Sequence, residues 1–465
     1  MPSSEAPDAP EDPTREKLLR LLKEHGWNAT SFQILEPGYR YFVVGDDACV
    51  AYVDTGSAWV AAGAPIAAPS ALEAVAQRFA ESAKKSQRRV CFFATEPRFT
   101  QSTPGLTSLC IGEQPVWEPM RWSEGVRKSR SLREQLRRAR SKGVKVRTVA
   151  PQELEDPQAP LRQEIDALGQ RWLGARQMAP MGFLVQLSLF TDASERRCLI
   201  AELGGQLVGV LGMIPVYARG GWFCEDFLRA PDAPNGTVEL LIDAAMQQAA
   251  AEGSQYITLG LAPLAGSLPV PLQMARRWGG ALYDFEGLRA FKAKLQPHEW
   301  VPISLTYPKG QSGVLTTLDV LTAFARGGLL RFGIETLLRG PAVVVRVLAA
   351  LLLPWTLLLA LAPASYFPAA WVKWAWVAFD MGLAAALLRL TYAWRPWLAT
   401  LLCVLVTGDA AVTLLEALLY NLPRAGGLWD VGVAAAAVAG PSLSAFLLWR
   451  GRMHRQTQIT PSPSS

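Results

Sequence analysis

The chain has 465 residues; half are hydrophobic, 18% are charged, and the formal net charge is +6. This length accommodates two or three domains, and the average composition is too apolar for an ordinary soluble enzyme. The apolar residues are unevenly distributed, because residues 1–300 have a globular composition whereas 341–450 are almost entirely Ala, Leu, Val and Trp. The sequence therefore predicts a soluble head followed by a membrane module.

Cysteine and histidine usage excludes several kinds of site. The six cysteines form no C-x-x-C pair, and there are only three histidines. This pattern argues against a zinc site, a disulfide framework, a histidine-based triad and a multi-histidine metal site. The N-terminus is polar, acidic and Pro-rich and does not resemble a signal peptide. We expect residues 1–12 to be a disordered leader.

The first half of the head combines helical and β-rich segments. Two S-x-x-E capping boxes, starting at Ser70 and Ser131, predict helices that extend to about Lys85 and Gly143. A further helix is expected over 14–24. Expected strands cover 39–44, 49–53, 89–94, 108–111 and 116–122.

The second half continues with a different order of elements. Expected helices cover 161–173, 235–251 and 272–278, and expected strands cover 198–203, 206–215, 222–228, 256–259 and 290–295. The first two strands form a hairpin around Gly204-Gly205. The order helix, hairpin, strand, helix, strand is typical of an acetyltransferase-like fold. We therefore predict an α/β class with two such folds in tandem, residues 13–150 and 151–305.

The C-terminal region contains four apolar stretches: 342–363, 369–390, 397–420 and 429–449. Each has about 20 residues, enough to cross a hydrocarbon core of roughly 30 Å. We expect 306–340 to be a juxtamembrane linker, 341–450 a bundle of about four transmembrane helices, and 451–465 a disordered tail. Lys and Arg are concentrated in the connections that the positive-inside rule assigns to the cytosol, which predicts a cytosolic head and C-terminus.

Three carboxylates fall within the predicted spans: Asp380, Asp409 and Glu416. Ionisable groups in a bilayer are costly and usually face a bundle interior or a polar cavity. Asp409 and Glu416 are seven residues apart and share one helix face. A lipid-headgroup or ion site, a simple helix–helix contact and, for Glu416, a position near the membrane interface all remain open.

A basic tract covers residues 121–147 and contains eleven Lys or Arg. Such density creates a positive potential that attracts phosphates. The candidate phosphate contacts, whose arginines follow helical spacing, are Lys128, Arg130, Arg133, Arg137 and Arg140. Their partner could be tRNA, anionic lipid headgroups or only solvent.

A second cluster contains Glu225, Asp226 and Arg229 at the end of a predicted strand, followed by Asn235-Gly236 at a helix start. A carboxylate can hold an ammonium group or accept a proton from an attacking hydroxyl. An arginine can bind a phosphate through two hydrogen bonds, and a helix start favours anions. A purely structural Asp–Arg pair is an equally ordinary explanation.

Several short motifs follow one another over residues 30–305. They are Leu132-Arg133, Asp226 with Arg229, Pro234-Asn235-Gly236, Leu259–Leu264, and Phe291–Lys294 with Pro297 and Trp300. In this order, they resemble the lipid aminoacyl-transferase domain of phosphatidylglycerol lysyltransferases, the multiple peptide resistance family. This family has a pair of acetyltransferase-like units, as predicted above. Its full-length members carry their membrane helices before the enzyme domain, whereas here the helices follow it.

The resemblance implies a reaction and its participants. Such enzymes transfer lysine or alanine from aminoacyl-tRNA to a hydroxyl of phosphatidylglycerol, an anionic lipid of the bacterial inner membrane, without a cofactor. By position, Asp226 would contact the substrate amine or the attacking hydroxyl, and Arg229 a phosphate or the oxyanion. The basic helix would contact the tRNA. Further substrate-binding candidates are Glu225, Asn235, Gly236, Lys292 and Lys294, of which the two lysines would contact a phosphate.

Two other functions are compatible with the pattern. An acyl-coenzyme A N-acyltransferase would share the fold, although the usual Q/R-x-x-G-x-G/A pyrophosphate loop is not recognisable in the second half. A catalytically inactive head that binds lipid or tRNA on a membrane scaffold is the other. The amino acid, the acceptor lipid and the oligomeric state are not determined by the sequence.

Overall fold

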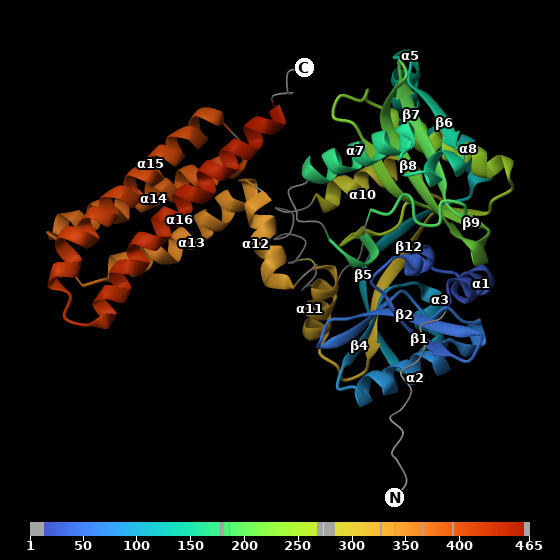
Figure 1. Cartoon of the computed structure of the whole chain (residues 1–465), viewed down its shortest axis with the longest axis horizontal. Helices are drawn as coiled ribbons and strands as arrows, with labels where there is room; N and C mark the ends of the chain where they lie inside the picture. Colours follow the sequence, from blue (N-terminus) through green and yellow to red (C-terminus); the bar gives the residue numbers. More distant parts are fainter. Residues whose placement is uncertain are drawn as a thin grey trace, which may run out of the picture. The chain divides into compact units, whose positions relative to one another are not determined.

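The structure is a computed structural model of the chain. It describes residues 14–175, 181–185, 187–266, 273, 284–325, 328–339, 341–363, 367–392 and 395–459. The chain divides into two compact units: an α/β head formed by residues 1–174 and 180–329, and a helical unit formed by 175–179 and 330–465 (Figure 1). The predicted leader, residues 1–12, and the predicted helix 272–278 lie largely outside the described residues.

The described part of the head contains one sheet of twelve strands. Its order is β1-β2-β3-β4-β12-β5-β10-β9-β8-β7-β6, and the short β11 pairs with β5. The strands are β1 Arg40–Val44, β2 Ala48–Asp54, β3 Ala58–Ala62, β4 Arg89–Thr95, β5 Leu106–Trp117, β6 Lys145–Val149, β7 Arg197–Leu203, β8 Gln206–Val216, β9 Gly221–Arg229, β10 Tyr256–Thr258, β11 Ala262–Pro263 and β12 Glu299–Pro308.

Helices pack against the sheet. They are α1 Arg15–His25, α2 Leu72–Lys85, α3 Pro97–Ser102, α4 Trp122–Lys128, α5 Arg130–Ser141, α6 Gln152–Glu155, α7 Pro160–Ala175, α8 Thr237–Ala251, α10 Phe285–Lys294 and α11 Gly313–Phe324, with the 3-10 helix η1 at Ala29–Leu35. Leu132 and Leu136 of α5 share a core with Leu241 of α8 and Leu199 of β7. This packing explains the apolar stripe in the otherwise basic α5.

The sheet runs continuously through both halves of the head. Strand β5, which was expected as two short strands, is a single strand that pairs with β10 through Trp117↔Ile257 and with β12 along Leu106–Val116. The hairpin β7–β8 is confirmed. The division at residue 150 into two folds stays a prediction, but β12 lies between β4 and β5. The C-terminal strand of the head therefore pairs with the first half.

Three local predictions were wrong. Residues 290–295 are helical rather than a strand, because they belong to α10, where Asp284 caps the Gly287 N–H. The capping box at Ser70 does not form, since α2 begins at Leu72 without a side-chain cap. The cap of α5 is Ser129 rather than Ser131: its Oγ accepts from Leu132 N and also donates to the Lys294 carbonyl. That tertiary contact selects between two nearby serines.

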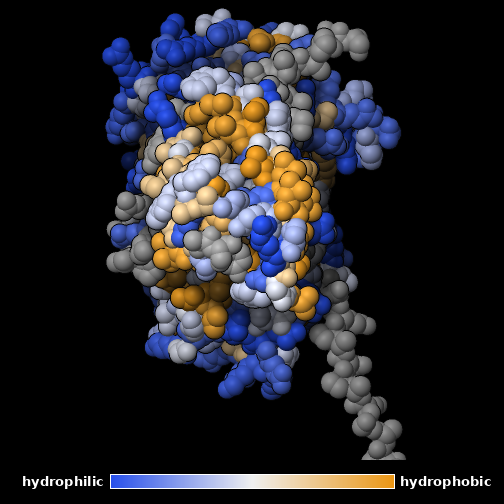
Figure 2. All heavy atoms as spheres, turned by 90° about the vertical axis from the view of Figure 1, so that its left-hand side faces the viewer, coloured by the Kyte–Doolittle hydropathy of each residue, from blue (hydrophilic) through white to orange (hydrophobic). Residues whose placement is uncertain are grey.

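The helical unit contains α12 Leu329–Arg339, α13 Pro341–Leu361, α14 Ala370–Tyr392, α15 Pro396–Glu416 and α16 Leu428–Ile459. Three described segments are long and apolar enough to cross a membrane: Ala370–Leu390, Pro396–Arg424 and Leu428–Arg450. The described part of α13, Val345–Leu361, is a shorter apolar helix, and the bent pair α11–α12 passes the same test jointly. Hydrophobic side chains form broad areas on the molecular surface (Figure 2), as membrane helices require.

These helices confirm an apolar C-terminal module with three to four candidate spans. Helix α16 continues to Ile459, beyond residue 450, where we expected a disordered tail to begin. Within the unit, a compact apolar core joins α13–α16 through residues such as Leu387, Leu402 and Leu448. The chain is therefore a membrane protein with a large α/β head.

Candidate active site

Strand β9 carries two consecutive predicted site residues, Glu225 and Asp226. The register with β8 passes from Gly212↔Asp226 to Met213↔Cys224, so that Glu225 is the additional residue of a β-bulge. A bulge interrupts the strict alternation of side chains and is common beside active sites, where it redirects a side chain. The bulge therefore allows two adjacent carboxylates to act in the same region.

Glu225 belongs to a buried ion cluster that the sequence did not reveal. Arg196 donates from Nη1 to Glu225 Oε2 at 2.7 Å and from Nη2 to Glu36 Oε1 at 2.9 Å. The three side chains are at most 5% exposed. Glu36 follows η1 in the first half of the head, whereas Arg196 and Glu225 belong to the second. Two carboxylates and one guanidinium give the ionised cluster a net charge of −1.

The electrostatics of the cluster oppose full ionisation. Burial, followed by the charge of Glu225, raises the pKa of Glu36, and Asp226 adds to this effect. Burial likewise raises the pKa of Glu225, against the influence of Arg196. The three carboxylates therefore lie within electrostatic reach of one another. A cation placed among them would stabilise their ionised forms.

Several hydrogen-bonding atoms of the cluster are buried without partners. The Gln33 amide donates to Glu225 Oε1 and to the Leu184 carbonyl. Within the described part of the chain, Gln33 Oε1, Glu36 Oε2 and the Tyr39 hydroxyl are buried and make no hydrogen bond. Orphaned buried polar atoms are costly and rare in folded proteins. Gln33 Oε1 can only accept, as can Glu36 Oε2 once Glu36 is ionised, so this arrangement suits a ligand with several N–H donors, such as a primary ammonium.

Arg229 and Asn235 organise the chain between β9 and α8. Arg229 is exposed, and its Nη2 donates to the Ala233 carbonyl at 2.7 Å and to Asn235 Oδ1 at 3.3 Å. Gly236 has a φ of +95°, and a Cβ there would lie 2.1 Å from the Gln135 carbonyl oxygen. Glycine is therefore required where α8 begins against α5. This close packing favours a structural role for Gly236 over the substrate contact that we expected.

Lys292 and Lys294 both interact with other groups of the protein through their ammonium groups. Lys292 is 4% exposed, and its Nζ donates to the carbonyls of Leu259, Gly260 and Leu261 at 2.8, 2.8 and 3.0 Å. Burial lowers the pKa of Lys292 to about 7. An ammonium has three donors, so these bonds favour a positioning role over the expected phosphate contact. Lys294 forms an ion pair with Glu239 in the first turn of α8.

The basic residues of α4 and α5 are all exposed, as predicted. Three of them nevertheless have acidic partners: Arg140 Nη2 lies 2.6 Å from Asp243 Oδ2, and Arg137 Nη2 and Arg138 Nε each lie 2.8 Å from Glu134 Oε1. Asp243 is buried on α8, so the Arg140 contact joins α5 to α8. Arg140 therefore has a structural role besides any contact with phosphate.

The remaining basic residues of α4 and α5 form fewer contacts within the protein. Arg133 Nη1 donates to the Val126 and Arg127 carbonyls and so caps the end of α4. For Lys128 and Arg130, the described part of the chain offers no ion pair. The positive electrostatic potential of an exposed cation is not reduced by a neighbouring carboxylate when the cation has no acidic partner. Lys128 and Arg130 are thus the strongest phosphate candidates on this surface.

The intramembrane carboxylates make contacts within the helical unit. Trp376 Nε1 of α14 donates to Glu416 Oε2 of α15 at 3.3 Å, and Thr413 donates to Asp409 Oδ1 one turn away. Asp380 is buried on α14. The contact of Glu416 matches the helix–helix alternative for that residue. A lipid-headgroup or ion site at these positions stays a prediction.

Sequence reasoning missed Gln33, Glu36, Tyr39 and Arg196. Each is a single polar residue without a motif, and Arg196 is distant in sequence from Glu36. The bulge that redirects Glu225 leaves no sequence pattern either. Among the described residues, no group of three or more His, Cys, Asp or Glu side chains could hold a metal ion.

Comparison with known proteins assigns the chain to a family. The family model described as "Phosphatidylglycerol lysyltransferase, C-terminal" matches residues 19–307, which include the whole ion cluster. The chain belongs to this family. The resemblance inferred from the motifs is confirmed, and the matched region ends within β12.

Curated relatives agree with this assignment, and a solved structure shares the fold. The lysylphosphatidylglycerol biosynthesis bifunctional protein LysX of Mycolicibacterium gilvum is 28% identical over 49% of this chain and 21% of its own length. The LysX protein of Nocardia farcinica is 27% identical over 68% of this chain and 29% of its own length. The chain thus spans less than a third of these relatives. The structure of L-PGS from Bacillus licheniformis shares the fold, with a TM-score of 0.58 and 23% identity over 68% of this chain and 98% of that chain.

Proposed function

We propose that this membrane protein transfers an aminoacyl group, lysine or alanine, from aminoacyl-tRNA to a hydroxyl of phosphatidylglycerol. The observation that carries the proposal is the buried cluster of Glu36, Arg196 and Glu225 within the family-matched region. Its two carboxyl groups beside a single guanidinium, and its unpartnered acceptors, suit the ammonium of an aminoacyl group, which would stabilise their ionised forms. An acyl group carried by coenzyme A has no such ammonium, so the cluster favours the aminoacyl donor.

The reaction exchanges one ester for another. The lipid hydroxyl oxygen bonds to the aminoacyl carbonyl carbon, the bond from that carbon to the tRNA ribose oxygen breaks, and the hydroxyl proton passes to the ribose oxygen. Catalysis then depends on positioning two large substrates and on stabilising the oxyanion. Asp226 accepts the hydroxyl proton or binds the amine, and Arg229 supplies donors to the oxyanion or a phosphate. Glu36 and Glu225 bind the ammonium.

The two substrates would approach from different environments. The exposed basic surface around Lys128 and Arg130 attracts tRNA phosphates, whereas phosphatidylglycerol is a component of the bilayer. The distribution of Lys and Arg around the apolar helices supports a bacterial inner-membrane protein with a cytosolic head and C-terminus. Aminoacyl-tRNA is available only on that side.

The proposal is tested with the purified full-length protein in nanodiscs that contain phosphatidylglycerol. Lysyl-tRNA or alanyl-tRNA, radiolabelled in the amino acid, is added, and the lipid extract is analysed for labelled phosphatidylglycerol by chromatography and mass spectrometry. We expect label in the lipid fraction with at least one donor. Free amino acid with ATP should give none, because the acyl group must arrive activated.

Matched variants separate catalysis from binding. Asp226→Asn should abolish transfer while tRNA binding persists, and Glu202→Gln, on the β7 hairpin, should behave as wild type. Label absent from the lipid with every donor tested, in a protein that still binds tRNA, would support a binding module instead. Acylation of an amine by acetyl-coenzyme A would support the N-acyltransferase alternative.

A further inference from the structure

Helix α11 binds the head through polar and apolar residues and has a second apolar side that faces outward. Its buried residues are Thr316, Asp319 and Val320, and Ala323 and Phe324 pack against the same core as Val320. In a soluble protein, the side of a helix that faces away from the core is normally polar. The arrangement in α11 therefore needs a second apolar environment on the outer side of the helix.

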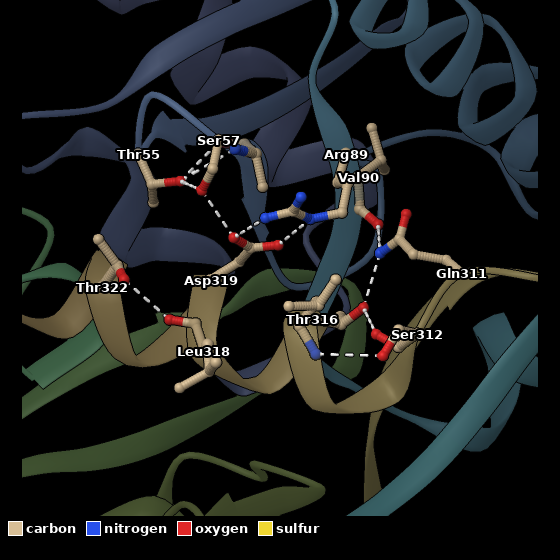
Figure 3. Close-up of polar contacts among 12 residues, drawn as sticks. Thr55, Ser57, Arg89, Val90, Gln311, Ser312, Thr316, Leu318, Asp319 and Thr322 are labelled. Carbon is tan, nitrogen blue, oxygen red and sulfur yellow. Dashed lines mark hydrogen bonds and ion pairs between the residues drawn. The ribbon is translucent and has the colours of Figure 1, made fainter.

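Polar contacts fix α11 firmly to the first half of the sheet (Figure 3). Asp319 accepts from Arg89 Nε at 2.7 Å, from Arg89 Nη2 at 2.8 Å and from Ser57 Oγ at 2.7 Å. At the start of the helix, Gln311 donates to the Val90 carbonyl and to Thr316 Oγ1. The Asp319 side chain is only 4% exposed. These contacts fix the orientation of α11 about its own axis and so determine which side faces outward.

The outward side consists of large aliphatic residues. Val314, Leu315, Leu318 and Leu321 are 72%, 46%, 45% and 49% exposed, respectively. Their spacing of one, three and four residues places them on one face of the helix. In Figure 3, Leu318 is directed away from the Asp319 contact. A contiguous exposed apolar face of this kind marks an interaction surface.

We propose that this aliphatic face of α11 is immersed in the membrane interface and docks the head on the lipid surface. In the chain, α11 is followed by α12 and then by the apolar helices α13–α16. Together, α11 and α12 are long and apolar enough for a membrane span. Helix α11 itself cannot span a bilayer, because its polar side is bound to the sheet. At the membrane interface, one side of α11 can remain bound to the sheet while its aliphatic side contacts lipid.

The residues that flank this face agree with a lipid surface. Lys309 lies just before α11 and is exposed, and Arg331 lies in α12 with an exposed side chain that pairs with Glu335. Basic residues beside an interfacial helix are attracted to anionic headgroups. A protein partner would not account for the continuity of α11 with the apolar helices. We therefore assign the face to lipid.

The test uses full-length protein in nanodiscs of phosphatidylglycerol and phosphatidylcholine, with and without acyl-chain bromination. An environment-sensitive fluorophore is attached to Leu318→Cys or Leu321→Cys. The background is Cys110→Ser, because the other five native cysteines are buried. Gln77→Cys, on the exposed side of α2, is the matched control. Brominated lipid should quench the probe at 318 and 321 at least about twofold more than at 77, as expected for a helix buried in the interface.

Two results would overturn the proposal. A blue-shifted probe without bromolipid quenching would mean that protein, not lipid, covers the face. An unshifted and unquenched probe would mean that the face is in water. Neither measurement depends on aminoacyl transfer, so failure of the proposed enzymatic activity would leave this test intact.

Discussion

Neutralising Glu36 should make the protein more stable and less active at the same time. Glu36→Gln keeps an oxygen for Arg196 and changes the charge of the fully ionised cluster from −1 to zero. Folding of the wild type must either protonate Glu36 or bury its charge beside Glu225, and removing this cost should stabilise the head by about 1–2 kcal/mol at neutral pH. For a domain of this size, the unfolding midpoint should rise by roughly 2–4 °C per kcal/mol.

The same substitution removes half of the negative charge available to an ammonium. At about 5 Å and an effective dielectric constant of about 20, one carboxylate–ammonium interaction amounts to about 3 kcal/mol. If most of this interaction persists in the transition state, kcat/KM should fall between about tenfold and a hundredfold. The assay is the nanodisc transfer reaction with labelled aminoacyl-tRNA, and Glu202→Gln is the control.

The pH dependence of stability and of transfer tests independently whether ionised Glu36 destabilises the folded head. Folding raises the pKa of Glu36, mainly through burial and then through the charge of Glu225. Its contribution to stability is therefore fully present below the ordinary carboxyl pKa and is lost as pH rises through the raised folded value. The stability of Glu36→Gln should be less sensitive to pH than that of wild type over this window, whereas wild-type transfer should increase with pH.

Unchanged kcat/KM in Glu36→Gln, with a higher unfolding midpoint, would refute the assignment of the cluster to the ammonium and leave it a purely structural feature. A lower midpoint would refute the electrostatic reasoning itself. Arg196→Met is a useful contrast, because it leaves two buried carboxylates unpaired. It should destabilise the head by about 3–5 kcal/mol, measured by the same unfolding experiment.

Three further predictions concern other parts of the head. Lys292→Met should cost about 2–4 kcal/mol of stability in denaturant unfolding, because the carbonyls of the 259–261 loop lose a buried ammonium; an unchanged midpoint would contradict the positioning role. Lys128→Glu with Arg130→Glu should weaken tRNA binding and reduce its dependence on salt concentration; an unaltered salt slope in filter binding would exclude this surface. Asp319→Ala should cost about 2 kcal/mol and increase hydrogen exchange in α11, whereas protection equal to wild type would show that other contacts hold the helix.

Much of the architecture was accessible from the sequence because it depends on local patterns. The apolar stretches after residue 341 predicted α13–α16, since the hydrocarbon thickness of a bilayer sets the length of a spanning helix. The Gly204-Gly205 turn predicted the β7–β8 hairpin through its backbone conformation. The family motifs identified the correct family, because short motifs around a site keep their order in the chain. Residues 290–295 were the exception, since a short apolar run does not distinguish a strand from a helix.

The candidate site depended on the tertiary structure. Glu36 and Arg196 become neighbours only because the sheet joins both halves of the head, and Glu225 reaches them through a bulge that has no sequence signature. Lys292 was expected to contact phosphate, yet burial directs its three donors to backbone carbonyls. Charge and periodicity in the sequence determined that the protein has a basic surface and a membrane module. Which charges are buried together, and hence which ligand they suit, was decided by contacts between residues far apart in the chain.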